Sequence, residues 1–273
     1  YVATHSQTFR DFLLIPELMR AIQHNAFEHT SEVQAEAIPR ALFGNDIICQ
    51  GQSGMGKTAV FVLSILNQLD VEGEVAALVI APSRELAYQI GDEFNRFSRF
   101  MKNVSTVCIY GGMPKATQTD LLRSRKPNIV IATPGRCLDF LKERHSPLDV
   151  SKVRYFVIDE ADKVLENEDM KRQVTQIFQK LPPIKQTMLF TATLPENMKE
   201  ILRKFTRNPK EILIDDPQRL TLHGLQQYYC KLQPSEKNRK LLDILDDFSY
   251  NQVVIFVSTK ERAKTLDGIL NQV

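Results

Sequence analysis

The stretch "GQSGMGKT", residues 51–58, decides the fold of this sequence. It lies between an apolar run (46–50) and an amphipathic one (58–69), and it matches the phosphate-binding loop pattern G-x-x-x-x-G-K-S/T. Glycine weakens any regular element that contains it, so this stretch is expected to be a loop between a strand and a helix. Such a loop points backbone N–H groups at phosphate oxygens, beside the positive end of the helix dipole. The alternative is an ordinary glycine-rich turn, which the flanking strand and helix patterns disfavour.

The residue types in the loop predict specific roles. Lys57 is expected to reach the β- and γ-phosphates of a nucleotide, and Thr58 to place its hydroxyl on Mg²⁺. The residues predicted to bind the nucleotide in this loop are Gln52, Ser53, Gly54, Met55, Gly56, Lys57 and Thr58.

Short apolar runs alternate with longer amphipathic ones along the first 214 residues. The predicted strands are 46–50, 76–81, 104–109, 128–132, 153–158, 187–191 and 211–214. The predicted helices between them are 58–69, 84–100, 114–124, 135–143, 169–180 and 196–205, and two more precede the first strand at 16–24 and 32–43. Near-continuous apolar strands separated by helices indicate a doubly wound α/β fold, in which helices cover both faces of a parallel sheet. Ser31 is expected to cap the helix at 32–43, and Gly44 to follow its end.

The pattern predicts a second, shorter domain. Residues 1–214 form the first predicted domain, and the polar stretch 215–225, with its Pro and Gly, is a predicted interdomain linker. Residues 226–273 are the predicted start of a second α/β domain, with strand 226–232, helix 236–248, strand 252–257 and helix 260–271.

Composition excludes several classes of protein. The chain has 273 residues, of which 43% are hydrophobic and 25% charged, as in soluble globular proteins. No run approaches the roughly 18 apolar residues of a membrane span, so no membrane association is expected. The net charge of +2 gives no global attraction to a polyanion, so any nucleic-acid site must be local. The four cysteines are too widely spaced in the sequence to suggest a metal knuckle.

A second acidic motif complements the loop. In "YFVIDEAD", residues 155–162, an apolar strand ends at Asp159 and Glu160. Asp159 is predicted to hold Mg²⁺, and Glu160 to polarise the attacking water of a hydrolysis reaction. The alternative is that these carboxylates only cap helix 160–167 and interact with its dipole. The phosphate-binding loop upstream favours the metal-dependent interpretation.

The ordered motifs resemble those of the DEAD-box RNA helicases of superfamily 2, and "DEAD" is spelled at 159–162. The resemblance covers almost the whole chain, and it implies a RecA-like fold, ATP and Mg²⁺ as cofactors and RNA-stimulated ATP hydrolysis. "AFEHTSEVQ", residues 26–34, is similar to the family's adenine-reading motif, which implies that Gln34 binds the adenine edge. Phe9 matches the family's isolated aromatic residue, which stacks on the base.

Three further loops are similar to those with which the family holds single-stranded RNA by its backbone. They are "PSRELA" at 82–87, a Gly-Gly pair, and "TPGR" at 133–136. The residues implied to bind RNA are Arg84, Gly111, Gly112, Thr133, Pro134, Gly135 and Arg136. Taken singly, the Gly-Gly and Pro-Gly pairs could be plain turns. None of these loops offers an aromatic platform, so recognition of the backbone rather than of bases is expected.

"TAT", residues 191–193, occupies the place of the family's motif III. The resemblance implies that the hydroxyls of Thr191 and Thr193 couple the nucleotide state to domain closure by contacting the DEAD carboxylates. Thr191 adds a methyl group to the serine that is usual there.

Longer stretches resemble one nuclear subfamily, which acts in spliceosome assembly and mRNA export. They are "FRDFLL", "SGMGKTAVFVL", "LTLHGLQQYY" and "NQVVIFV". The resemblance implies nuclear localisation, a monomer, and spliceosome and transcription–export proteins as partners. The departures from the subfamily pattern are Ala26, Thr30, Gly51 and Ala161, of which Ala161 replaces a cysteine between the DEAD carboxylates.

In this family a second RecA-like domain supplies arginine fingers, and its motifs would lie downstream of residue 273. We therefore expect this C-terminally truncated chain alone to bind ATP or ADP, to hydrolyse ATP very slowly and not to unwind RNA. Two other classes remain open. One is a different P-loop enzyme, such as a nucleotide kinase or GTPase. The other is a non-enzymatic scaffold that docks partner proteins and whose conformation is fixed by the bound nucleotide.

Overall fold

A computed structural model describes residues 8–70, 74–214, 226 and 228–271. The chain divides into two compact units, Tyr1–Leu220 and Thr221–Val273, here called the larger and the smaller unit. The larger unit is built around one parallel sheet with the strand order β3-β4-β2-β5-β6-β1-β7. Its strands are β1 (Ile47–Gln50), β2 (Ala77–Ile80), β3 (Thr106–Ile109), β4 (Ile129–Ala132), β5 (Tyr155–Ile158), β6 (Gln186–Thr191) and β7 (Lys210–Leu213). Each predicted strand of this unit is confirmed to within two residues at either end.

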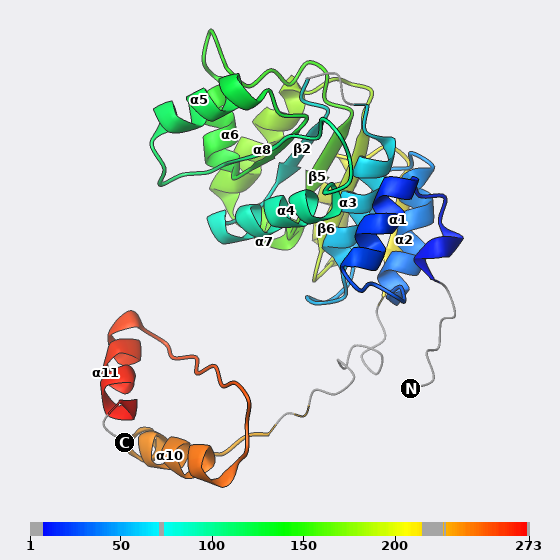
Figure 1. The fold of residues 1–273 in the computed structure, drawn as a ribbon. Helices are drawn as coiled ribbons and strands as arrows, with labels where there is room; N and C mark the ends of the chain where they lie inside the picture. The colour runs from blue at the N-terminus through cyan, green and yellow to red at the C-terminus, as the bar shows by residue number, and fades with distance from the viewer. Residues whose placement is uncertain (1–7, 71–73, 215–225, 227, 272–273) are drawn as a thin grey trace. The chain divides into compact units, whose positions relative to one another are not determined.

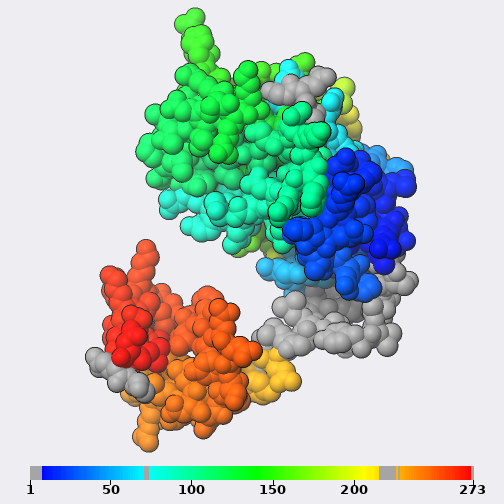
Figure 2. All heavy atoms as spheres, viewed as in Figure 1, coloured from blue at the N-terminus to red at the C-terminus, as the bar shows by residue number. Residues whose placement is uncertain are grey.

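Helices cover both faces of the sheet (Figure 1). One face carries η1 (Phe9–Asp11), α1 (Pro16–His24), α2 (Glu32–Leu42), α3 (Lys57–Gln68) and α4 (Arg84–Phe97). The other face carries α5 (Lys115–Arg125), α6 (Pro134–Leu141), α7 (Ala161–Glu166), α8 (Glu168–Lys180) and α9 (Glu196–Arg203). Helix α1 lies against α3 and α4, and Figure 2 shows this blue N-terminal segment beside the cyan and green ones. The predicted α/β class is confirmed.

The strand sequences explain the two layers. Successive side chains of a strand point to opposite faces of a sheet. In β2, Ala77 and Val79 enter the core below α3 and α4, whereas Leu78 and Ile80 enter the core below α6 and α8. All four are fully buried. A strand that is buried on both faces needs apolar side chains at every position, so an uninterrupted apolar run in the sequence predicts such a strand.

Helix α2 begins and ends as its sequence predicts. The Ser31 hydroxyl accepts a hydrogen bond from the backbone N–H of Gln34 (3.2 Å), and Gln34 Oε1 accepts one from the backbone N–H of Ser31 (2.9 Å). This reciprocal arrangement satisfies N–H groups that a helix start leaves without partners. Gly44 follows the helix with φ +77°, a conformation that glycine adopts without a steric penalty.

The sheet brings the sequence motifs together at one edge. The loops at residues 51–56, 81–83, 110–114, 133, 159–160 and 192–195 each follow the carboxyl end of a strand. Because all strands are parallel, these loops share one edge of the sheet, where open α/β folds bind their ligands.

The smaller unit differs from the prediction. It contains η2 (Pro234–Glu236), α10 (Lys237–Asp247) and α11 (Lys260–Leu270), so both predicted helices are confirmed. The predicted strands 226–232 and 252–257 are wrong, because residues 226, 228–232 and 252–257 form no strand. A strand requires a partner for its backbone, and no such pairing is present in the described part of this unit. In the second segment the apolar side chains of Val253, Val254 and Phe256 are exposed, Phe256 by 91%. The predicted linker at 215–225 lies outside the described residues.

Within the part of the chain that the structure describes, no helix is long and apolar enough to cross a membrane.

Candidate nucleotide and RNA site

The phosphate-loop sequence forms a tight loop between β1 and α3. Gly54 and Gly56 adopt φ +87° and +74°, and Gly56 is the N-cap of α3, which begins at Lys57. The Lys57 ammonium group folds back over the loop and donates hydrogen bonds to the carbonyl oxygens of Gly51 and Gln52. Burial lowers the pKa of Lys57, and the Asp159 carboxylate opposes that effect. The loop thus holds the Lys57 side chain beside the N-terminus of α3, where the helix dipole favours an anion such as phosphate.

A cavity of about 620 Å³ opens in front of this loop. Its lining comes from the loop and the start of α3, from the DEAD segment and its surroundings, from one side of α4, and from Phe27 before α2 and Gln34 in the first turn of α2. These residues are Ser53, Gly54, Gly56, Lys57, Thr58, Ala59, Asp159, Glu160, Asp162, Lys163, Ala192, Leu86, Gln89, Ile90, Glu93, Arg96, Phe27 and Gln34. The structure therefore brings Lys57, Thr58, Asp159 and Gln34 to a single cavity. The predicted nucleotide contacts Gln52, Met55 and Phe9 do not line it.

Asp159 is a buried carboxyl group at the end of β5. It is 4% exposed, and its Oδ1 accepts a hydrogen bond from the backbone N–H of Glu160 (2.9 Å). Burial raises its pKa to about 6, although the charge of Lys57 and this hydrogen bond counteract the rise. A divalent cation would restore the ionised form. Thr58 lines the same cavity and offers a hydroxyl oxygen, so the donor set suits Mg²⁺, which needs few protein oxygens beside those of phosphate and water.

Glu160 adopts an unusual backbone conformation. Its φ and ψ are 49° and 51°, in the left-handed region, so α7 begins at Ala161 and not at Glu160 as the predicted helix 160–167 did. Glu160 is the N-cap of α7, but its side chain makes no capping hydrogen bond. It forms an ion pair with Lys163 (2.9 Å) and lines the cavity. The capping interpretation of this carboxylate is therefore wrong for Glu160.

The last DEAD carboxylate contacts the TAT segment. Asp162 Oδ2 accepts hydrogen bonds from the backbone N–H groups of Ala192 (3.2 Å) and Thr193 (3.1 Å), and from the Thr193 hydroxyl (3.2 Å). The Thr191 hydroxyl instead donates to the carbonyl oxygen of Thr193 (2.6 Å). Of the two hydroxyls expected to contact the DEAD carboxylates, the one on Thr193 does so here, and the one on Thr191 stabilises the bend that presents it.

Gln34 joins two motifs that are distant in sequence. Its side chain is 4% exposed, and its Nε2 donates a hydrogen bond to the carbonyl oxygen of Gly56 (3.2 Å). Its Oε1 accepts from Ser31, as the first turn of α2 requires. The predicted base reader is thus attached to the phosphate loop at the wall of the cavity.

Phe9, which was expected to stack on the base, does not line the nucleotide-site cavity. Phe9 is 1% exposed and belongs to the core, where its ring packs against Phe12 and Phe27 with centroids 6.0 Å apart in each pair. Phe27, not Phe9, lines the nucleotide-site cavity. The Arg96 guanidinium lies over the Phe27 ring (5.2 Å) and is paired with Glu93 (2.6 Å). Sequence reasoning missed these residues. Phe27 stands inside the quoted segment 26–34, whereas nothing in the sequence singles out Arg96 or Glu93 of α4.

The three predicted RNA loops lie side by side at the ends of β2, β3 and β4. Arg84 Nη1 donates a hydrogen bond to the carbonyl oxygen of Gly111 (3.4 Å). Arg136 donates through Nη1 and Nη2 to the carbonyl oxygen of Met113 (3.1 Å each). Both arginines predicted to contact RNA therefore bind the Gly-Gly loop in this structure. Thr133, Pro134 and Gly135 form the N-cap and first turn of α6.

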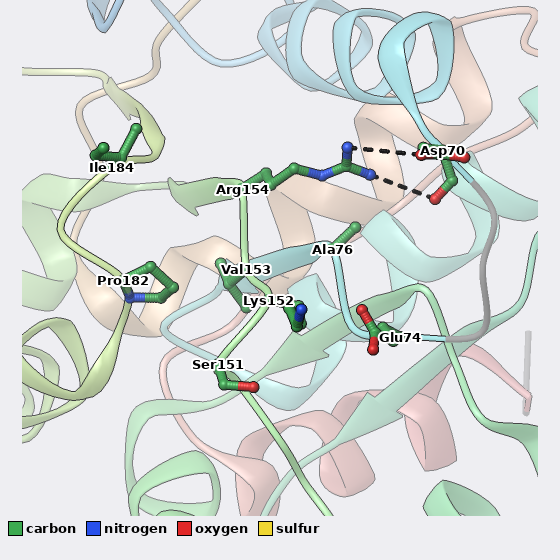
Figure 3. A pocket seen from close by; sticks show the side chains of 9 residues that line it. All are labelled: Asp70, Glu74, Ala76, Ser151, Lys152, Val153, Arg154, Pro182 and Ile184. Atoms are coloured by element: carbon green, nitrogen blue, oxygen red, sulfur yellow. Dashed lines mark hydrogen bonds and ion pairs between the residues drawn. The ribbon is translucent and has the colours of Figure 1, made fainter.

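A cavity of about 320 Å³ lies at the opposite edge of the sheet (Figure 3). Its lining includes Ala76, Val153 and Arg154, which precede β2 and β5, and Arg154 forms an ion pair with Asp70 (4.0 Å). None of the predicted site residues lines this cavity. It is separate from the nucleotide site because the motifs follow the carboxyl ends of the strands.

Comparison with known proteins agrees with this geometry. The family model "DEAD/DEAH box helicase" matches residues 31–201, and the chain belongs to this family. It is 54% identical over 274 residues to the ATP-dependent RNA helicase SUB2 of Saccharomyces cerevisiae, covering 99% of this chain and 61% of the relative. It is 52% identical to the DEAD-box ATP-dependent RNA helicase 56 of Oryza sativa subsp. japonica, covering 99% of this chain and 62% of the relative. The chain thus spans about three fifths of the length of these curated relatives.

Among solved structures, the chain is similar to S. cerevisiae Dbp5 bound to RNA and ADP BeF3. The TM-score is 0.82 at 28% sequence identity, covering 98% of this chain and 67% of the other. A second Dbp5 structure, the L327V variant bound to Gle1 H337R and IP6, gives a TM-score of 0.80 at 29% identity, covering 98% and 66%. The predicted RecA-like fold is confirmed.

Proposed function

We propose that the whole protein is an ATP-dependent RNA helicase, and that this chain supplies its nucleotide-binding half and one side of its RNA-binding surface. The observation that carries the proposal is the single cavity lined by the phosphate loop, the DEAD carboxylates and Gln34. The three loops expected to hold RNA follow neighbouring strands of the same sheet edge. Family membership and the printed names of the relatives support the same activity.

ATP and Mg²⁺ are the proposed cofactors. Lys57, freed from the carbonyl oxygens that it now contacts, would bind the β- and γ-phosphates, and the loop N–H groups would surround them. Thr58 and Asp159 would hold the metal ion, which stabilises charge on the transferred phosphoryl group. Gln34 would read the adenine edge. Glu160 would orient and polarise the attacking water, because it lines the cavity beside Asp159.

RNA is the proposed substrate, bound through its backbone. Arg84 and Arg136 already hold the Gly-Gly loop, so the backbone N–H groups of Gly111 and Gly112 and the N-terminus of α6 are the donors proposed for phosphate oxygens. Such contacts do not distinguish sequences. In the helicase, closure on ATP and RNA would bend one strand so that its duplex partner leaves.

We also propose a nuclear role in splicing and mRNA export, with spliceosome and transcription–export proteins as partners of a monomer. The subfamily resemblance in the phosphate-loop and 220–229 segments supports this part of the proposal.

The proposed function is tested on the whole protein by measuring phosphate release from ATP with and without single-stranded RNA, for wild type and Glu160→Gln. RNA is expected to stimulate release, and Glu160→Gln to lower turnover by ~10²-fold or more while retaining ATP binding. Transfer of the phosphoryl group to an acceptor other than water would contradict the proposal and favour a kinase. Background hydrolysis combined with ATP-dependent binding of protein partners would also contradict it and favour a scaffold.

A further inference from the structure

Gln118 is a fully buried amide on α5, beside the proposed RNA site. Its Nε2 donates a hydrogen bond to the carbonyl oxygen of Tyr110 (2.9 Å), and its Oε1 accepts one from Arg136 Nη1 (2.8 Å). Burying an amide is unfavourable unless its hydrogen bonds are made. Here the polar group makes contacts with two different segments, the strand end before the Gly-Gly loop and the first turn of α6.

Arg136 makes the complementary contact. Its Nη1 and Nη2 both donate to the carbonyl oxygen of Met113, and Nη1 also donates to Gln118. The loop 110–113 is therefore held at both ends, at Tyr110 by Gln118 and at Met113 by Arg136. Between these ends lie the two glycines predicted to bind RNA.

Gln118 lies on α5 and Arg136 on α6, and this pair is here called the clamp. A second set of contacts joins the two helices. Lys115 of α5 forms an ion pair with Glu143 (2.6 Å), donates to the carbonyl oxygen of Asp139 (3.1 Å) and lies over the Phe140 ring (5.1 Å). These contacts join the N-terminus of α5 to α6. The relative position of Gln118 and Arg136 is therefore fixed by the protein itself.

The loop conformation requires such support. Gly112 adopts φ +92°, and a Cβ atom added there would lie 2.1 Å from Arg84 Nη1. Glycine loses more conformational entropy on ordering than any other residue, so a Gly-Gly loop is not ordered by its own sequence. A ligand that binds the loop backbone gains affinity when the loop is already ordered.

We infer that Gln118 and Arg136 are positioning residues that hold the backbone of residues 110–113 ready for an RNA phosphate. This inference rests on the proposed RNA-binding function. Arg136 acts through the loop and not as a direct phosphate contact, and Gln118 acts through both Arg136 and Tyr110. The clamp makes no contact with the nucleotide-site cavity, because neither residue is among those that line it.

The clamp is tested by titrating a fluorescent oligouridine with the 273-residue chain, for wild type, Gln118→Met and the control Gln176→Met, an exposed position of α8. Gln118→Met is expected to lower RNA affinity ~5- to 30-fold. The carbonyl oxygen of Tyr110 loses its donor, and Arg136, which holds Met113, loses its acceptor on Gln118. ATP affinity is expected to stay within about twofold of wild type. Wild-type RNA affinity in Gln118→Met, or an equal loss of ATP and RNA binding, would overturn the inference.

A second variant separates positioning from direct contact and serves if Gln118→Met fails to fold. The affinity of Arg136→Gln for the same RNA is measured over a series of salt concentrations. Loss of a direct phosphate contact reduces the slope of log affinity against log salt by about one. The clamp instead predicts a loss of affinity with an unchanged slope. A slope reduced by one would overturn it. Absence of RNA binding by the wild-type chain would overturn the proposal that this chain supplies one side of the RNA-binding surface.

Discussion

Gln34 Nε2 donates a hydrogen bond to the carbonyl oxygen of Gly56, 3.2 Å away. These residues come from different motifs, one at the start of α2 and the other at the start of α3. Because the same amide also accepts a hydrogen bond from Ser31, the first turn of α2 and the phosphate loop form one hydrogen-bonded unit. The residue predicted to read the base is thus also a support of the loop predicted to bind phosphate.

Gly56→Ala is expected to lower the free energy of unfolding by more than the left-handed backbone conformation of Gly56 alone would cost. A Cβ atom at Gly56 would lie 2.2 Å from Gln34 Nε2, and φ is +74°. Gly44→Ala is the matched control, since φ is +77° there but no atom lies within 4 Å of the added Cβ. In urea denaturation, Gly44→Ala should lower the free energy of unfolding by about 1–2 kcal/mol, the cost of the left-handed conformation. Gly56→Ala should cost more and weaken ATP binding. Equal losses of stability with ATP binding intact would contradict the Gln34–Gly56 contact.

Asp159→Asn is expected to stabilise the fold in a pH-dependent way. The folded-state pKa of about 6 lies above the ordinary value of 3.8, so the unfolded state loses its proton first as the pH rises. Folding therefore becomes less favourable between about pH 4 and pH 6, by up to about 3 kcal/mol, and the full cost persists above that range. Asparagine does not ionise and retains an oxygen for the Glu160 N–H group.

Urea denaturation of both proteins at pH 4.5 and 7.5 checks this prediction, because their difference cancels the other titrating groups. The variant should exceed wild type in stability at ~pH 7.5, and this gain should shrink at ~pH 4.5. A difference independent of pH would contradict a buried Asp159 with a raised pKa.

The two hydroxyls of the TAT segment should contribute differently to stability. Thr191 is fully buried, and Thr191→Val would leave the carbonyl oxygen of Thr193 without its donor. Thr193→Val removes one of three hydrogen bonds to Asp162 at an exposed position. We expect Thr191→Val to lower the free energy of unfolding by about 1–3 kcal/mol and Thr193→Val by about 1 kcal/mol or less. The reverse order in thermal or urea denaturation would show that the TAT bend is held in another way.

The sequence predicts those parts of the larger unit that depend on local pattern. Residues 77–80 are apolar at every position because both faces of β2 are buried, and runs rich in apolar residues predict the other strands of the sheet. Ser31 and Gly44 mark the ends of α2 because capping needs only neighbouring residues. The phosphate loop is predictable for the same reason.

Features that depend on the tertiary structure are not predictable from these patterns. The segment 252–257 has the composition of a strand but forms none, because a strand needs a partner elsewhere in the chain. Arg136 matches a motif implied to bind RNA, yet its guanidinium contacts depend on Gln118 and Met113, which only the fold brings within reach. Arg96 lines the nucleotide-site cavity because of its place on α4.

We propose that the chain binds adenine nucleotides through Lys57 and Gln34. Calorimetric titration with ATP and GTP in the presence of Mg²⁺, for wild type, Lys57→Ala and Gln34→Ala, tests it most directly. We expect wild type to prefer ATP by ~10-fold or more, Lys57→Ala to weaken binding ~10- to 100-fold, and Gln34→Ala to weaken ATP binding and to abolish the preference. Equal binding of ATP and GTP by wild type, or ATP binding that is unchanged in Lys57→Ala, would contradict it.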